Sequence, residues 1–115
     1  MTNTAEADWI KVATNSGIAE DSAVHVEVAG RPVCLARSRG RLYGLLDECS
    51  HGEVLLSEGD VEDGTVECYM HGSQFDLASG RPLTPPAVHP VPTFAVRVDG
   101  DDVYVSVEPL AKADP

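Results

Sequence analysis

The amino-acid sequence predicts an all-β domain, an antiparallel sandwich or small barrel, and three observations lead to that prediction. Fifteen of the 115 residues are valine, and β-branched side chains lose little rotamer freedom in a strand. Turn-forming residues recur every eight to twelve positions along the chain. No stretch of ten or more residues has the apolar periodicity of a helix. Short strands with frequent turns are typical of sandwiches and small barrels.

The first part of the chain predicts four strands. Alternation is clearest over 23–29, where three valines lie on one face and His25 and Glu27 on the other. The glycine at position 40 suits the loop of a hairpin between the third and fourth strands. The expected strands cover residues 9–13, 23–29, 33–37 and 42–46.

Two long loops, 47–59 and 69–80, interrupt the strands of the second part. The segment 81–93 follows, and its five prolines exclude a helix or a central strand. We therefore expect this segment to lie across the surface as a stiff cover. The Asp99-Gly100-Asp101 turn predicts a closing hairpin, and residues after 108 are expected to be a frayed tail. The strands expected here cover residues 65–68, 74–76, 94–98 and 103–107.

Composition excludes several classes of protein. The net charge is −11, from 19 acidic and 8 basic residues, and such a charge repels nucleic acid and anionic membranes. No apolar run approaches the roughly 18–20 residues of a membrane span, and residues 1–8 lack the features of a secretory signal. We expect a soluble, cytoplasmic, single-domain protein over 1–115, with its core at about 9–108.

Each long loop contains one cysteine and one histidine. The loops read Cys49-Ser50-His51-Gly52 and Cys68-Tyr69-Met70-His71-Gly72-Ser73. Cys-x-His and Cys-x-x-His place two metal-binding side chains close together on an irregular backbone. Two thiolates and two imidazoles suit one tetrahedral Zn²⁺, or an iron–sulfur centre in which two histidines replace two cysteines on one iron. The ligand types alone leave both possibilities open.

The two pairs, separated by sixteen residues, resemble the signature of Rieske proteins, which bind a [2Fe–2S] cluster. Further similarity to small Rieske-type ferredoxins lies in the glycine after each histidine, Ser73, Phe75-Asp76, Ser79-Gly80 and the prolines that follow. The resemblance spans about 9–108. It implies a Rieske-type β-sandwich or barrel with a two-loop cluster-binding subdomain at 47–80, under the proline-rich cover at 81–93.

The resemblance also implies a ligand set. Cys49 and Cys68 would bind one iron, and His51 and His71 the other, nearer the surface. Neutral imidazoles in place of thiolates make reduction easier, and Rieske centres range from about −150 to +300 mV against about −400 mV for plant-type ferredoxins.

Rieske proteins of respiratory and photosynthetic complexes differ from this chain at three positions. Those proteins carry a disulfide between two further cysteines, at positions matching Val54 and Met70. They also have a tyrosine where this chain has Phe75, although Ser73 is shared. In those proteins the hydroxyl groups of this tyrosine and of the serine donate toward a ligand sulfur, and such hydrogen bonds stabilise the reduced cluster. Because this chain lacks the tyrosine hydroxyl, we expect a reduction potential toward the low end of the range.

The function implied by the resemblance is that of a one-electron carrier, not an enzyme. It would pass electrons from a flavin-containing NAD(P)H reductase to a terminal oxygenase. The extra iron site of an oxygenase needs two more histidines and a carboxylate, whereas only His25 and His89 remain here. Three alternatives stay open: the small subunit of a nitrite reductase, a ferredoxin of iron–sulfur assembly, and a zinc-held interaction module.

The cysteine and the two histidines outside the two loops are not expected to bind the cluster. We expect Cys34 to be a core residue, His25 to be plain surface, and His89 to have a structural role in the proline-rich segment. The charge pattern suggests a docking surface for a basic partner, because no Lys or Arg lies between Arg41 and Arg81. Nine acidic residues fall in that interval: Asp47, Glu48, Glu53, Glu58, Asp60, Glu62, Asp63, Glu67 and Asp76.

Overall fold

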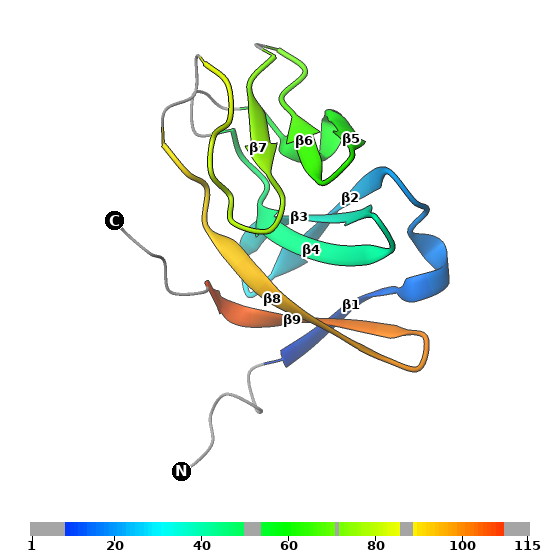
Figure 1. Ribbon diagram of the computed structural model, residues 1–115. Coiled ribbons are helices and arrows are strands. Elements are labelled where there is room, and N and C mark those ends of the chain that lie inside the picture. Colours follow the sequence, from blue (N-terminus) through cyan, green and yellow to red (C-terminus); the bar gives the residue numbers. More distant parts are fainter. Residues whose placement is uncertain (1–8, 50–53, 71, 86–88, 110–115) are drawn as a thin grey trace.

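The computed structural model describes residues 9–49, 54–70, 72–85 and 89–109, and within them the chain forms two antiparallel sheets (Figure 1). The larger sheet has six strands in the order β1-β9-β8-β4-β3-β2. Because β1 and β2 also contact each other, this sheet nearly closes into a barrel. Its strands are β1 (Trp9–Thr14), β2 (Ser22–Val28), β3 (Arg31–Ser38), β4 (Arg41–Leu46), β8 (Thr93–Asp99) and β9 (Asp102–Pro109).

The smaller sheet is inserted between β4 and β8 and lies at the upper end of the molecule in Figure 1. Its three strands, in the order β5-β6-β7, are β5 (Asp60–Glu62), β6 (Thr65–Glu67) and β7 (Gln74–Asp76). The described helical structure consists of two single turns, η1 (Asn15–Gly17) and η2 (Leu56–Glu58). Among the described residues, no helix has the length and apolar character needed to cross a membrane.

Strand β3 is buried on both faces, which divides the interior into two cores. Val33 and Leu35 pack on the barrel side, with the buried side chains of β8 and β9. Cys34 and Ala36 point to the opposite side and pack against the smaller sheet. The second core also holds Leu45, Cys49, Leu56, Val61, Val66, Cys68, Phe75, Leu77 and Val91. The smaller sheet is therefore positioned by the outer face of β3 and β4.

A turn-to-turn contact fixes the smaller sheet on the β3–β4 hairpin. The backbone N–H of Gly64 donates to the Ser38 hydroxyl at 2.8 Å, and Ser38 is fully buried. Beside it, the Arg39 guanidinium donates to Asp63 Oδ1 at 2.7 Å. The Gly64 carbonyl in turn accepts from the backbone N–H of Leu77 at 3.0 Å. These bonds hold the β5–β6 turn, and with it the start of β6, in a fixed place on the barrel.

The proline-rich cover ties the two sheets together from the other side. Leu83 N–H donates to the Gln74 carbonyl at 2.6 Å, and Val91 N–H donates to the Gly80 carbonyl at 2.9 Å. The N–H of Leu46 at the end of β4 then donates to the Pro92 carbonyl at 2.9 Å. The described residues of the segment 81–93 are thus bonded to both sheets.

The all-β prediction is confirmed, and the predicted strands match the observed ones within one or two residues at each end. Strand β5 was not expected, since it lies between the expected loop 47–59 and the expected strand 65–68. Only Val61 of its three residues is apolar and buried, so the strand is too short for alternation to reveal it.

Candidate metal centre

The first long loop carries a buried cysteine three residues after the end of β4. Cys49 is 2% exposed, and its backbone N–H donates to the carbonyl of Val54 at 2.8 Å. Val54 packs against the same core as Cys49. The bond joins the described residues on either side of the segment 50–53, to which position 51 belongs in the sequence.

The second loop is closed in the same way. Cys68 follows β6 directly and is fully buried, and its N–H donates to the carbonyl of Ser73 at 2.8 Å. The N–H of Gly72 returns to the Cys68 carbonyl at 2.8 Å, with Gly72 at a φ of 77°. A residue with a Cβ rarely adopts that conformation, so the glycine after the histidine position suits this tight turn.

The structure therefore brings the two predicted cysteines into one buried cluster at the heads of two similarly closed turns. None of the three cysteines is in a disulfide. Two buried thiols on irregular loops fit a soft metal or an iron–sulfur cluster. The other two predicted ligands, His51 and His71, lie outside the described residues.

The comparison with protein families decides between zinc and an iron–sulfur centre. The family model described as "Rieske [2Fe-2S] domain" matches residues 8–95, which include both loops and the whole cover. The chain belongs to the Rieske [2Fe–2S] domain family. The cofactor of this Rieske domain is a [2Fe–2S] cluster, and the two buried thiols fit it.

Relatives of this Rieske protein are ferredoxin components of dioxygenases. The biphenyl 2,3-dioxygenase ferredoxin component of Rhodococcus jostii is 34% identical over 98 residues, 85% of this chain and 92% of the relative. The anthranilate 1,2-dioxygenase ferredoxin subunit of Burkholderia cepacia is 34% identical over 107 residues, covering 93% and 99%. These relatives are electron-transfer components and not themselves catalytic enzymes.

Solved structures give the same result. A chain from the complex of reduced oxygenase and oxidized ferredoxin in carbazole 1,9a-dioxygenase has a TM-score of 0.86 and 31% identity, covering 91% of this chain and 98% of that one. The putative NADH-dependent nitrite reductase small subunit of Mycobacterium tuberculosis has a TM-score of 0.77 at 21% identity, covering 85% and 93%. That second likeness shows a common fold only.

A buried carboxylate two residues before Cys49 holds both ends of the first loop. Asp47 is fully buried, and it accepts hydrogen bonds from the N–H of Ser57 at 2.7 Å and from the Ser57 hydroxyl at 2.6 Å. Its own N–H donates to the Pro32 carbonyl at 2.9 Å. Buried carboxylates need such partners, because desolvation without them is costly. Asp47 therefore connects β4, the loop and η2.

His25 completes this network. It lies at the surface as expected, with its side chain 37% exposed, but it is bonded to two carboxylates. Its Nδ1 lies 2.6 Å from Asp47 Oδ2 and its Nε2 lies 2.9 Å from Glu27 Oε2. The hydrogen bond to Asp47, and then that to Glu27, raises the pKa of His25 above its ordinary value. Sequence reasoning placed His25 correctly on the polar face of β2, but the partner 22 positions away gave no local signal.

The third cysteine belongs to the core, as predicted. Cys34 is fully buried on β3, opposite His25 of β2. Burial is the main cause that raises the pKa of its thiol, and the nearby Asp47 carboxylate adds to it. A thiol with a raised pKa stays protonated, and only the thiolate is a metal ligand.

Two further residues named in the sequence analysis lie beside the cysteines. Ser73 and Phe75 are both fully buried, and Phe75 packs in the same core as Cys49 and Cys68. His89 is exposed in the cover.

Proposed function

We propose that this Rieske protein is a one-electron carrier between an NAD(P)H-dependent flavin reductase and a terminal Rieske non-heme iron oxygenase. The matched pair of closed turns, each headed by a buried cysteine, is the observation that carries the proposal. The named ferredoxin relatives support this setting. We also propose that it works in the cytoplasm as one domain over residues 1–115.

The proposed ligands are Cys49 and Cys68 for one iron and His51 and His71 for the other. The bound [2Fe–2S] cluster supplies reversible one-electron chemistry. The protein contributes a dry environment on the cysteine side, where Cys49 and Cys68 are at most 2% exposed. It also fixes the loop backbones through the bonds to Val54 and Ser73.

Oxygen activation is not part of the proposed role. A mononuclear iron site needs two histidines and a carboxylate with open positions. Outside the proposed ligands the sequence has only His25 and His89. Both ring nitrogens of His25 already face carboxylates, those of Asp47 and Glu27. The chemistry on substrate would therefore belong to the partner.

The test is to purify the protein without oxygen and to measure iron, acid-labile sulfide and the EPR spectrum of the reduced sample. We expect about two irons and two sulfides per chain and a Rieske-type signal. Cys68→Ala should abolish the signal, whereas Cys34→Ala is a matched control for another fully buried cysteine of the same core. That control should keep both irons. A colourless protein with one zinc would overturn the proposal.

The reduced protein should then transfer its electron and keep its cluster. Rapid mixing with the terminal oxygenase of its own system should reoxidise it without release of iron to a chelator. Transfer of the whole cluster to an apo-protein acceptor would instead indicate a role in iron–sulfur assembly.

A further inference from the structure

Three large apolar side chains are exposed around the second cluster loop. Tyr69 is 55% exposed, Met70 58% and Leu83 52%. Tyr69 and Met70 lie between the proposed ligands Cys68 and His71 in sequence. We refer to Tyr69, Met70 and Leu83 as the apolar tip. Exposed apolar side chains gathered near a functional site are typical of interaction surfaces.

Leu83 reaches this region because the cover runs beside the returning arm of the loop. Its N–H donates to the Gln74 carbonyl at 2.6 Å. The next residue, Thr84, accepts from the Gln74 N–H at 2.8 Å and donates from its hydroxyl to the Gly72 carbonyl at 3.3 Å. The apolar tip thus belongs to one surface around the second loop.

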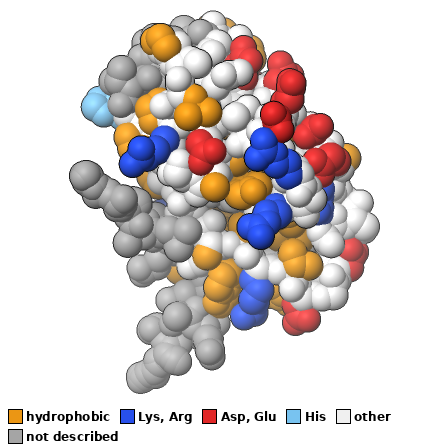
Figure 2. Space-filling view, viewed as in Figure 1, with side chains coloured by type: hydrophobic (Ala, Val, Ile, Leu, Met, Phe, Trp, Pro, Cys, Tyr) orange, Lys and Arg blue, Asp and Glu red, His pale blue; other side chains and the backbone are white. Residues whose placement is uncertain are grey.

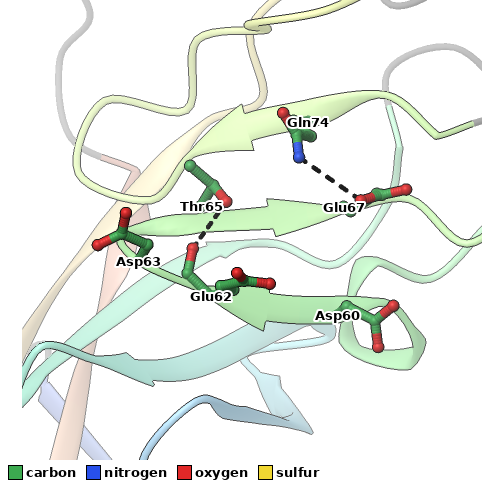
Figure 3. A pocket seen from close by; sticks show the side chains of 6 residues that line it. All are labelled: Asp60, Glu62, Asp63, Thr65, Glu67 and Gln74. Carbon is green, nitrogen blue, oxygen red and sulfur yellow. Dashed lines mark hydrogen bonds between the residues drawn. The ribbon is translucent and has the colours of Figure 1, made fainter.

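An acidic hollow of about 260 Å³ lies on the smaller sheet beside this loop, and Figure 3 shows its lining. Its walls are Asp60, Glu62, Asp63, Thr65, Glu67 and Gln74. Glu67 connects the hollow to the loop, because its Oε2 lies 3.7 Å from the place that a Cβ on Gly72 would take. Figure 2 shows acidic side chains gathered along one side of the upper part of the molecule.

The acidic side chains that line the hollow lie on one flank of the apolar tip. Strand β7 pairs with β6 along one edge, and across its other edge Phe75 makes a bridge to Pro82 of the cover. The acids of the hollow come from β5, β6 and their turn. On the cover side, next to Pro82, stands the exposed Arg81. The acidic hollow and Arg81 therefore lie on opposite sides of β7.

We propose that the apolar tip and the acidic hollow form one docking surface for a redox protein whose contact site is apolar at its centre and lined by Lys or Arg along one side. This inference rests on the proposed function and adds the recognition chemistry of the partner. Acidic groups accelerate encounter with a cationic site, and the apolar centre excludes water from the contact. Because the hollow lies beside the tip and not at its centre, it also favours one orientation of the partner.

Mitochondrial cytochrome c is a suitable probe, because it is a cationic redox protein with an exposed haem edge. The reduced, cluster-loaded protein is mixed with oxidised cytochrome c, and the second-order rate of electron transfer is measured against salt concentration. Each variant is first checked for two irons and an unchanged Rieske EPR signal. Failure of that check concerns the proposed function, so it is separate from failure of docking.

Two variants and two matched controls make the test specific. Asp60→Asn with Glu62→Gln removes two charges of the hollow, and Asp21→Asn with Asp99→Asn removes two exposed charges elsewhere. Leu83→Ser removes an apolar side chain of the tip. Val98→Ser removes one that is 44% exposed on the β8–β9 hairpin at the other end of the molecule (Figure 1).

We expect the charge variant of the hollow to slow transfer about fivefold at low salt, with the loss vanishing at high salt. Leu83→Ser should slow transfer about threefold at every salt concentration. Both controls should stay within a factor of about 1.5 of the parent protein. Equal losses in the controls, or unchanged rates in the hollow and tip variants, would overturn the proposal.

Discussion

The imidazole of His25 lies against the carboxylate of Asp47, with Nδ1 2.6 Å from Oδ2, although the His25 side chain is 37% exposed and that of Asp47 is fully buried. The pair joins the surface of β2 to the loop that carries Cys49. A titratable group at the surface is thereby coupled to the backbone beside a proposed ligand.

This pair predicts that part of the stability depends on pH. The pKa of His25 is raised in the folded protein, so its contribution is complete below the unfolded value of about 6.5. That contribution is lost as pH rises through the higher folded pKa. His25→Asn should therefore lower the free energy of unfolding by about 1 kcal/mol at pH 5.5, and by less at pH 9, for a partly exposed pair. Thermal unfolding at the two pH values measures the difference.

Glu27→Gln is the control for the pH effect. It removes only the outer carboxylate, which is 62% exposed, and leaves the bond to Asp47 in place. Its effect should be the smaller of the two. An equal loss for His25→Asn at both pH values would contradict the prediction.

Ser57→Ala should destabilise the first cluster loop. The Ser57 hydroxyl donates to the buried Asp47 carboxylate at 2.6 Å, and a hydrogen bond to a charged group contributes about 1.5–3 kcal/mol. We expect a loss of about that size in urea unfolding, together with faster loss of iron to a chelator. Ser79→Ala removes a similar bond, 2.7 Å to Asp76, that is exposed. If this control lost as much stability as Ser57→Ala, the burial of Asp47 would not explain the loss in Ser57→Ala.

Gly80→Ala should disrupt the attachment of the cover. Gly80 has a φ of 76°, and a Cβ there would lie 2.1 Å from the Val91 carbonyl oxygen. Since that oxygen is backbone, the cover must move, and we expect a loss of about 3 kcal/mol or more.

Gly30→Ala separates the two causes in Gly80→Ala. Gly30 has a similar φ of 84° but nothing within 4 Å of the added Cβ. It should lose only about 1 kcal/mol, from the backbone conformation alone. Equal losses in urea unfolding would show that the close contact at Gly80 does not matter.

We expect the residues at positions 73 and 75 to influence the midpoint reduction potential of the cluster. A hydrogen bond to a ligand sulfur favours the reduced cluster by about 1 kcal/mol, on the order of 40 mV for one electron. Ser73→Ala should therefore lower the midpoint potential by that order, and Phe75→Tyr should raise it. A redox titration of each variant measures the shift. A parent midpoint near the top of the Rieske range, about +300 mV, would contradict the expectation of a low potential.

Most of the barrel could be predicted from the sequence, because its strands alternate along 24–28 and around the Asp99-Gly100-Asp101 turn. The two ligand loops stood out through their Cys and His spacing. Strand β5 escaped prediction, since its pairing with β6 determines it more than its own three residues do. The role of Asp47 was not predicted, for a similar reason. Its partners His25 and Ser57 lie 22 and 10 positions away, and folding alone brings them together.

Because β3 contributes side chains to both cores, the two cluster loops depend on the barrel for their support. Cys34 and Ala36 supply the wall on which the smaller sheet rests, while Val33 and Leu35 belong to the barrel. A fragment from 47 to 93 would lose that wall and expose Val61, Val66 and Phe75 to water. The portable unit is therefore the two loops together with the hairpin beneath them, and a graft onto another scaffold must bring β3 and β4 along.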